Sequence, residues 1–145
     1  MNRFHLERVI KAPLSVVWNT ADFTKPVGHY RTEMITPGDP DNHQVGYTRA
    51  VSSGGRTIVE RLLSVNPQTS YTYTLIEGVP IKSDYLGQVA FVPKGNDTKI
   101  IWTASFTPRF FGTGWFGAIM IRRTVNQIID YIESESMNAA SADHS

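Results

Sequence analysis

Alternation of apolar and polar residues through the middle of the chain, from Gln44 to Thr107, is the feature that most constrains its fold. A period of two residues places side chains on alternate faces of a β-strand. Short turns containing Gly, Pro and Asn separate the alternating segments, because these residues adopt the backbone angles that tight turns need. Connections this short join neighbouring strands that run in opposite directions. The pattern therefore predicts an antiparallel sheet, and its clearest strands are Arg56 to Val65, Ser70 to Ile76, Asp84 to Val92 and Lys99 to Thr107.

Helical signals lie at both ends of this run of strands. A further strand is expected at Phe4 to Ile10, and Pro13 then suits the first turn of a short helix that ends near Ala21. A long helix is expected to follow Gly117 and to end near Ser134, with an apolar stripe that includes Ile121, Val125 and Ile128. Helices flanking an antiparallel sheet predict the α+β class. Since sheets twist, one helix covers a curled sheet only partly, and a cavity between them is expected.

Length and composition limit the kind of protein. A chain of 145 residues predicts one domain, over residues 1–135, and the small polar residues 136–145 predict a disordered tail. The net charge of +1 argues against nucleic acid as a partner. There is no cysteine, the histidines lack metal-ligand spacing, and no apolar run is long enough for a membrane span. We therefore expect a soluble, cytoplasmic protein with no metal and no cofactor.

Arg49 and Glu60 form the most informative polar pair. Ser53-Gly54-Gly55 provides the residues of a tight hairpin, and a loop made of the two glycines places Arg49 directly opposite Glu60. A loop one residue earlier makes the pair diagonal, but the two side chains share a face in either register. On the inner face the pair would orient a polar group of a ligand, whereas on the outer face it is a solvated salt bridge. The sequence leaves both readings open, because each face of the second strand carries apolar residues.

Large rings gather on the strand faces that a curled sheet would turn inward. In a pocket such rings supply apolar contact while phenol and indole groups orient the ligand, and in a filled core the same polar tips reach backbone or water. Trp18 is assigned to the ordinary core of the first helix, and Arg122 and Arg123 to a solvated helix face. For the aromatic loop before the long helix, three roles remain open, namely gating a pocket, anchoring a homodimer or sealing the core. The candidate ligand-binding residues are Tyr47, Arg49, Glu60, Tyr71, Tyr73, Tyr85, Trp102, Phe106, Phe116 and Met120.

Several stretches resemble a known superfamily. They are Val9-Ile10-Lys11-Ala12-Pro13, Val17-Trp18, Gly54-Gly55-Arg56 and Val59-Glu60-Arg61-Leu62-Leu63. Together with the order of elements, they are similar to the START-like superfamily that includes the Bet v 1 allergens, and within it to the bacterial polyketide cyclase/dehydrase-type branch. The resemblance implies a helix-grip fold, in which a curved seven-stranded antiparallel sheet, with one or two short helices after its first strand, grips the C-terminal helix around a hydrophobic cavity.

Three functions are compatible with this resemblance. The first is binding of a small hydrophobic or aromatic molecule between the sheet and the C-terminal helix. The second is a cofactor-independent cyclase or dehydratase that would use groups such as Arg49, Glu60 and Tyr73 for acid/base chemistry on the bound ligand, although no residue spacing assigns a catalytic pair. The third is a regulatory domain that binds a protein partner through Trp115 and Phe116. An enclosed cavity with convergent polar groups favours the first two functions, and an exposed apolar patch favours the third.

Overall fold

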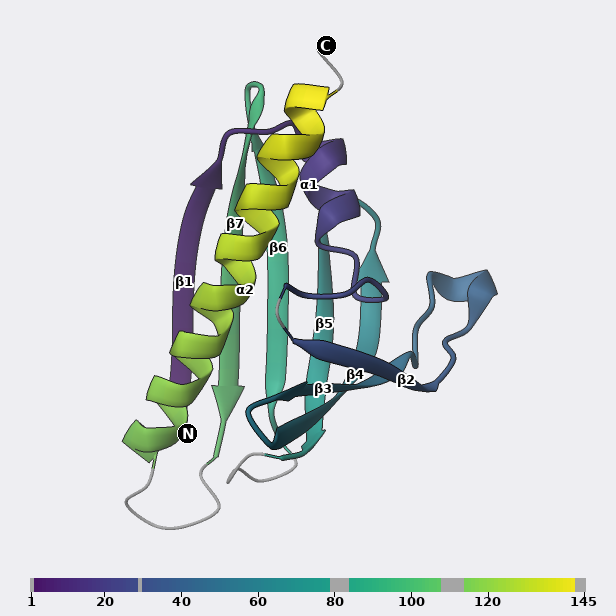
Figure 1. Cartoon of the computed structure of the whole chain (residues 1–145), viewed down its shortest axis with the longest axis vertical. Helices are drawn as coiled ribbons and strands as arrows, with labels where there is room; N and C mark the ends of the chain where they lie inside the picture. The colour runs from purple at the N-terminus through teal and green to yellow at the C-terminus, as the bar shows by residue number, and fades with distance from the viewer. Residues whose placement is uncertain (1, 29, 79–83, 108–113, 143–145) are drawn as a thin grey trace.

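The computed structural model describes residues 2–28, 30–78, 84–107 and 114–142, apart from the side chains of residues 2, 114–118, 120 and 142. Within these ranges, seven strands follow the alternating segments of the sequence, with a short helix after the first strand and a long one at the end (Figure 1). The elements are β1 (Asn2–Ile10), α1 (Leu14–Thr20), β2 (Arg31–Thr36), the 3-10 turn η1 (Pro40–Asn42), β3 (Thr48–Ser53), β4 (Arg56–Asn66), β5 (Ser70–Glu77), β6 (Leu86–Lys94), β7 (Asp97–Phe106) and α2 (Gly114–Ala142).

The strands form one antiparallel sheet in the order β1-β7-β6-β5-β4-β3-β2. β1 pairs with β7, which is distant from it in sequence, and this pairing runs from Asn2 opposite Phe106 to Ile10 opposite Thr98. The other pairs are sequence neighbours, as hairpin-length connections predict. The sheet curves, and β2 and β3 turn away from the direction of the remaining strands (Figure 1). This confirms the expected α+β architecture with a seven-stranded antiparallel sheet.

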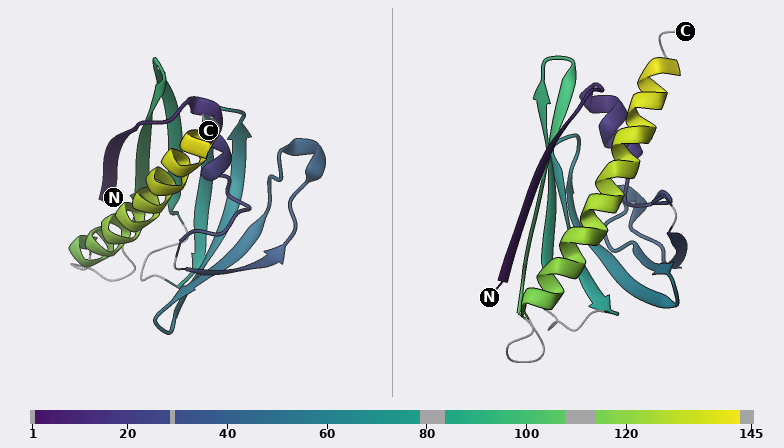
Figure 2. Two further views of the ribbon diagram at one scale, coloured as in Figure 1. Left: turned by 45° about the horizontal axis from the view of Figure 1, so that its top comes forward. Right: turned by 60° about the vertical axis from the view of Figure 1, so that its left-hand side comes forward.

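Helix α2 lies obliquely across the concave face of the sheet, and α1 lies beside its C-terminal half (Figure 2). The core fills the layer between them. The predicted stripe of α2 is buried, with Ile129 and Ile132 at 0% and 2% exposure, and it belongs to the same hydrophobic cluster as the inward-facing alternate residues of β7. The helix packs mainly on β1 and α1. Less of it therefore covers the sheet toward β3 and β4, and this is where the site described below lies.

Helix α2 is longer than its sequence pattern indicates. It continues through Ser136 and Ala140 to Ala142, so the expectation of a disordered tail from residue 136 is wrong for residues 136–142. Ser136 is completely buried and Ala140 packs against the core. Small side chains at these positions let the last turns of the helix lie close to their neighbours. In the part of the chain that the structure describes, no helix has the length and apolarity needed to cross a membrane.

Candidate functional site

Arg49 and Glu60 lie directly opposite each other on β3 and β4, in the register that a Gly54-Gly55 loop predicts. Arg49 Nε donates a hydrogen bond to Glu60 Oε2 over 3.0 Å. The two side chains are only 8% and 12% exposed, so the pair faces the interior and not bulk solvent. The reading of this pair as a solvated salt bridge on the outer face is therefore wrong. An ion pair that is this well shielded from water is electrostatically much stronger than a surface pair.

A second nitrogen of Arg49 holds the segment that follows α1. Its Nη1 donates to the carbonyl oxygens of Phe23 and Lys25, at 2.5 Å and 3.3 Å. The guanidinium carbon also lies 4.1 Å from the centre of the Phe23 ring, a cation–π contact. Arg49 thus connects the sheet to residues 23–25 and neutralises Glu60 at the same time. Since these contacts engage Nε and Nη1, one role of Arg49 is to hold the shape of the site.

Three of the predicted aromatic residues form a hydrogen-bonded chain deep in the sheet–helix layer. Trp102 Nε1 donates to the Tyr73 hydroxyl over 2.9 Å, and the Tyr73 and Tyr85 hydroxyls are 3.0 Å apart. Gly87 on β6 makes room for the chain, because a Cβ atom there would lie 2.4 Å from the Tyr73 ring. Burial raises the pKa of both Tyr73 and Tyr85 well above the usual value for tyrosine. Both phenols therefore stay neutral near pH 7 and act as hydrogen-bond donors or acceptors.

A cavity of about 350 Å³ lies between β3, β4, α2 and the two residues Val27 and Tyr30. A smaller space of about 40 Å³ lies beside it and is lined by Tyr73, Tyr85 and Trp102. The two spaces share four lining residues, namely Ile58, Glu60, Thr124 and Ile128. We refer to them together as the sheet–helix cavity. The larger space is also lined by Val27, Tyr30, Arg49, Val51, Ser53, Arg56, Arg123 and Gln127.

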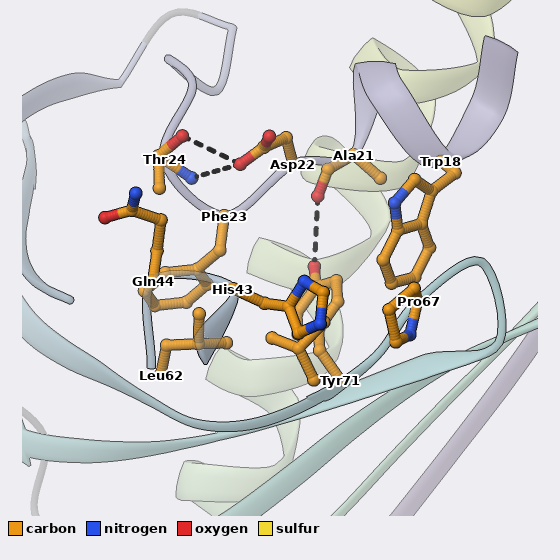
Figure 3. A pocket seen from close by; sticks show the side chains of 11 residues that line it. Trp18, Ala21, Asp22, Phe23, Thr24, His43, Gln44, Leu62, Pro67 and Tyr71 are labelled. Atoms are coloured by element: carbon orange, nitrogen blue, oxygen red, sulfur yellow. Dashed lines mark hydrogen bonds between the residues drawn. The ribbon is translucent and has the colours of Figure 1, made fainter. Parts of the chain in front are cut away.

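A second pocket, of about 200 Å³, lies beneath the end of α1 (Figure 3). Trp18, Phe23 and Tyr71 provide aromatic walls, and His43 reaches over them from the turn after η1. Asp22 is already engaged at the rim, where its Oδ1 accepts hydrogen bonds from the backbone N–H and hydroxyl of Thr24. Trp18 packs against the core, as its sequence position predicts, and its half-buried ring contacts Phe91 and Tyr71 edge-on. The same ring also lines this pocket.

The structure divides the predicted site residues among different places. Tyr71 lines the pocket beneath α1, separate from the sheet–helix cavity. Tyr47 and Phe106 line neither the pocket beneath α1 nor the sheet–helix cavity. Tyr47 packs edge-on against Phe23, and the fully buried Phe106 ring stacks on Tyr85. The side chains of Phe116 and Met120 are outside the described part of the chain. The predicted residues that line the sheet–helix cavity are Arg49, Glu60, Tyr73, Tyr85 and Trp102.

Sequence reasoning missed the helical wall of the cavity. Thr124 and Ile128 from α2 face Ile58 and Glu60 of β4 across both spaces. The apolar stripe of the helix contained the necessary signal, since Ile128 belongs to it and Thr124 lies one helical turn earlier. Arg123 was assigned to a solvated helix face. Its side chain is exposed, but it also lines the larger space.

Comparison with known families gives one match over nearly the whole chain. A family described as polyketide cyclase/dehydrase and lipid transport matches residues 1–132. No curated protein sequence matches the chain.

Solved structures share the fold at low sequence identity. An uncharacterised protein from Bacillus thuringiensis aligns with a TM-score of 0.75 at 16% identity, covering 94% of this chain and 99% of its own. Ara h 8.0201 aligns with a TM-score of 0.74 at 13% identity, and the alignment covers 94% of this chain and 98% of Ara h 8.0201. Norcoclaurine synthase from Thalictrum flavum, in complex with dopamine and hydroxybenzaldehyde, aligns with a TM-score of 0.73 at 15% identity. The alignment covers 94% of this chain and 87% of the synthase. These likenesses confirm the helix-grip fold, and with the family match they confirm the resemblance to the Bet v 1-like superfamily.

Proposed function

The chain belongs to the polyketide cyclase/dehydrase and lipid transport family, and we propose that it binds a small, mainly apolar molecule in the sheet–helix cavity. The volume of about 350 Å³ falls in the range of small-molecule sites. Val27, Val51, Ile58 and Ile128 provide apolar walls. Burial of an apolar ligand against such walls stabilises the complex by roughly 25 cal/mol per Å² removed from water, before the costs of association.

The observation that carries this proposal is the position of the Arg49–Glu60 pair. Beside the apolar residues of the cavity lies an ion pair that is shielded from solvent and aligned by hydrogen bonds from Arg49 to two backbone carbonyls. Ligand sites commonly combine apolar surface with a few polar groups held in place. The pair supplies the polar groups that orient a ligand, and β3 and β4 hold them rigidly.

Thr124→Phe is expected to weaken ligand binding at least about tenfold, because Thr124 lines both parts of the cavity and the larger ring would fill space that the ligand needs. Phenylalanine and threonine have similar helix propensities, so α2 should form normally. The measurement is isothermal titration calorimetry with the neutral probe 2-naphthamide. The matched control is Val65→Phe, which introduces the same ring into the pocket beneath α1. If Val65→Phe weakens binding and Thr124→Phe does not, the ligand occupies the other pocket and the proposal is wrong.

Acid/base chemistry on the bound molecule is a second candidate function. It is favoured by the presence of the Glu60 carboxylate and two neutral phenols, Tyr73 and Tyr85, along one small space. A carboxylate can accept a proton from the carbon beside a ligand carbonyl while a phenol donates a hydrogen bond to the carbonyl oxygen. The expected result is faster deuterium incorporation into the methyl group of 2-acetonaphthone, followed by NMR in heavy water, and loss of that acceleration in Glu60→Gln. Equal rates with and without the protein would reject the catalytic candidate and leave ligand binding intact.

A further inference from the structure

We propose that the ligand of the sheet–helix cavity is an amphipathic carboxylate, with its anionic group bound by Arg123 at the opening and its apolar part between Ile58 and Ile128. This inference rests on the proposed binding function and adds the chemical class of the ligand. The three residues line the same space, with Arg123 and Ile128 on α2 and Ile58 on β4.

Arg123 is a cation that the fold leaves available at this opening. Its side chain is exposed, and across the described residues it makes no ion pair. Asp130 and Glu133, two and three turns later on α2, both pair with Arg8 from β1. Arg122, the adjacent residue, points elsewhere, and its guanidinium carbon lies 5.0 Å from the centre of the Phe4 ring. Of these two consecutive arginines, only Arg123 lines the cavity.

The charges around the larger space favour an anion over a cation. Its charged lining residues are Arg49, Arg56, Glu60 and Arg123. The only carboxylate among them, Glu60, is paired with Arg49. Arg56 already has an interaction partner, so the proposal rests on Arg123. The Arg123 guanidinium would therefore attract a negative group at the opening. Glu60 would repel that group little, because Arg49 already balances its charge.

A carboxylate suits this arrangement better than a phosphate. The planar guanidinium matches a carboxylate in a bidentate pair, and one positive charge balances one negative charge. A phosphate monoester carries close to two negative charges at neutral pH, and sites for it commonly use several donors. The apolar walls next to Arg123 then bury the hydrocarbon part of the same molecule. An aromatic or aliphatic carboxylic acid is therefore the ligand class that fits both features.

The test compares 2-naphthoate with its neutral amide, 2-naphthamide, by isothermal titration calorimetry on the full chain. Wild type should bind 2-naphthoate about five- to tenfold more tightly than the amide. Arg123→Gln should remove this preference, because it weakens 2-naphthoate binding far more than 2-naphthamide binding. Arg122→Gln is the matched control, because it removes the neighbouring charge on the Phe4 side and should preserve the preference. Added salt should reduce the preference in wild type and have little effect in Arg123→Gln.

Each contrary outcome has a distinct meaning. If the amide and the carboxylate bind wild type equally, or if Arg122→Gln removes the preference as fully as Arg123→Gln, the inference about Arg123 is overturned while the binding function stands. Tighter binding of 2-naphthyl phosphate than of 2-naphthoate overturns the assignment to a carboxylate. If no probe binds, and native mass spectrometry of protein purified from its own source shows no small molecule, the proposed binding function itself fails.

Discussion

Arg49→Met is expected to lower the free energy of unfolding by about 3 to 5 kcal/mol, which is the range for removing one partner of a buried ion pair. The substitution leaves the Glu60 carboxylate, 12% exposed, without its partner. It also removes the hydrogen bonds to the carbonyl oxygens of Phe23 and Lys25 and the contact with the Phe23 ring. Urea unfolding followed by circular dichroism measures the loss.

Arg61→Met is the matched control for this prediction. Arg61 is on the neighbouring strand, opposite Thr48, but its side chain is exposed and its Nε donates only to the Thr48 hydroxyl, over 3.2 Å. Its replacement should change the free energy of unfolding by no more than about 1 kcal/mol. Equal losses in Arg49→Met and Arg61→Met would contradict the buried ion pair.

A double variant separates the charge effect from lost packing. Replacing Glu60 with leucine in the Arg49→Met background removes the uncompensated charge and should restore about half or more of the lost stability. The Phe23 and Lys25 carbonyls remain without Arg49, so recovery should be incomplete. A double variant that is less stable than Arg49→Met alone would show that the loss does not come from the unpaired carboxylate.

The shared face of Arg49 and Glu60 could be predicted from sequence because it depends on local information, whereas two registers of the hairpin stayed open until the structure showed the directly opposite one. Two glycines fix the loop of the hairpin, and both have positive φ in the structure. The face of the sheet could not be assigned, since Val59 and Leu63 make the outer side of β4 look as apolar as the inner side. Leu63 is in fact 41% exposed. Irregular pairing of β4 with β5 near Glu60 and again near Ser64 breaks the simple alternation, and the sequence carries no signal for it.

The shape of the cavity could not be predicted because it depends on contacts between distant elements. The sequence placed Tyr73, Tyr85 and Trp102 on inward faces, but it did not show that their polar groups bond to each other. That chain of hydrogen bonds fills the centre of the layer and leaves the larger space near β3 and β4. The C-terminal limit of α2 could not be predicted for a related reason. Small polar residues indicate a tail, yet Ser136 is completely buried in the folded chain.

Alkaline solution is expected to destabilise the fold steeply above pH ~10, the ordinary pKa of tyrosine. Burial is the main cause that raises the pKa of Tyr71, Tyr73 and Tyr85 in the folded state. Above pH ~10 the unfolded chain therefore releases protons that the folded chain retains, and unfolding becomes more favourable. Their contribution to stability is fully present below pH ~10 and is lost as the pH rises toward their raised pKa values. Each tyrosine contributes a slope of about 1.4 kcal/mol per pH unit, so the three together contribute roughly 4 kcal/mol per pH unit.

Tyr71→Phe isolates one of these three contributions. The Tyr71 hydroxyl makes only a long hydrogen bond, 3.4 Å, to the Ala21 carbonyl oxygen, so its removal should cost little near pH 7. Above pH ~10 the variant should become more stable than wild type, because its unfolded state has one phenol fewer to ionise. Phenolate absorbance and far-ultraviolet circular dichroism, recorded on the same samples, should show the ionisation of the buried tyrosines coinciding with unfolding. If Tyr71→Phe and wild type lose stability with the same slope in alkali, Tyr71 does not hold its proton in the folded state, and the pocket beneath α1 is more open to water than its geometry indicates.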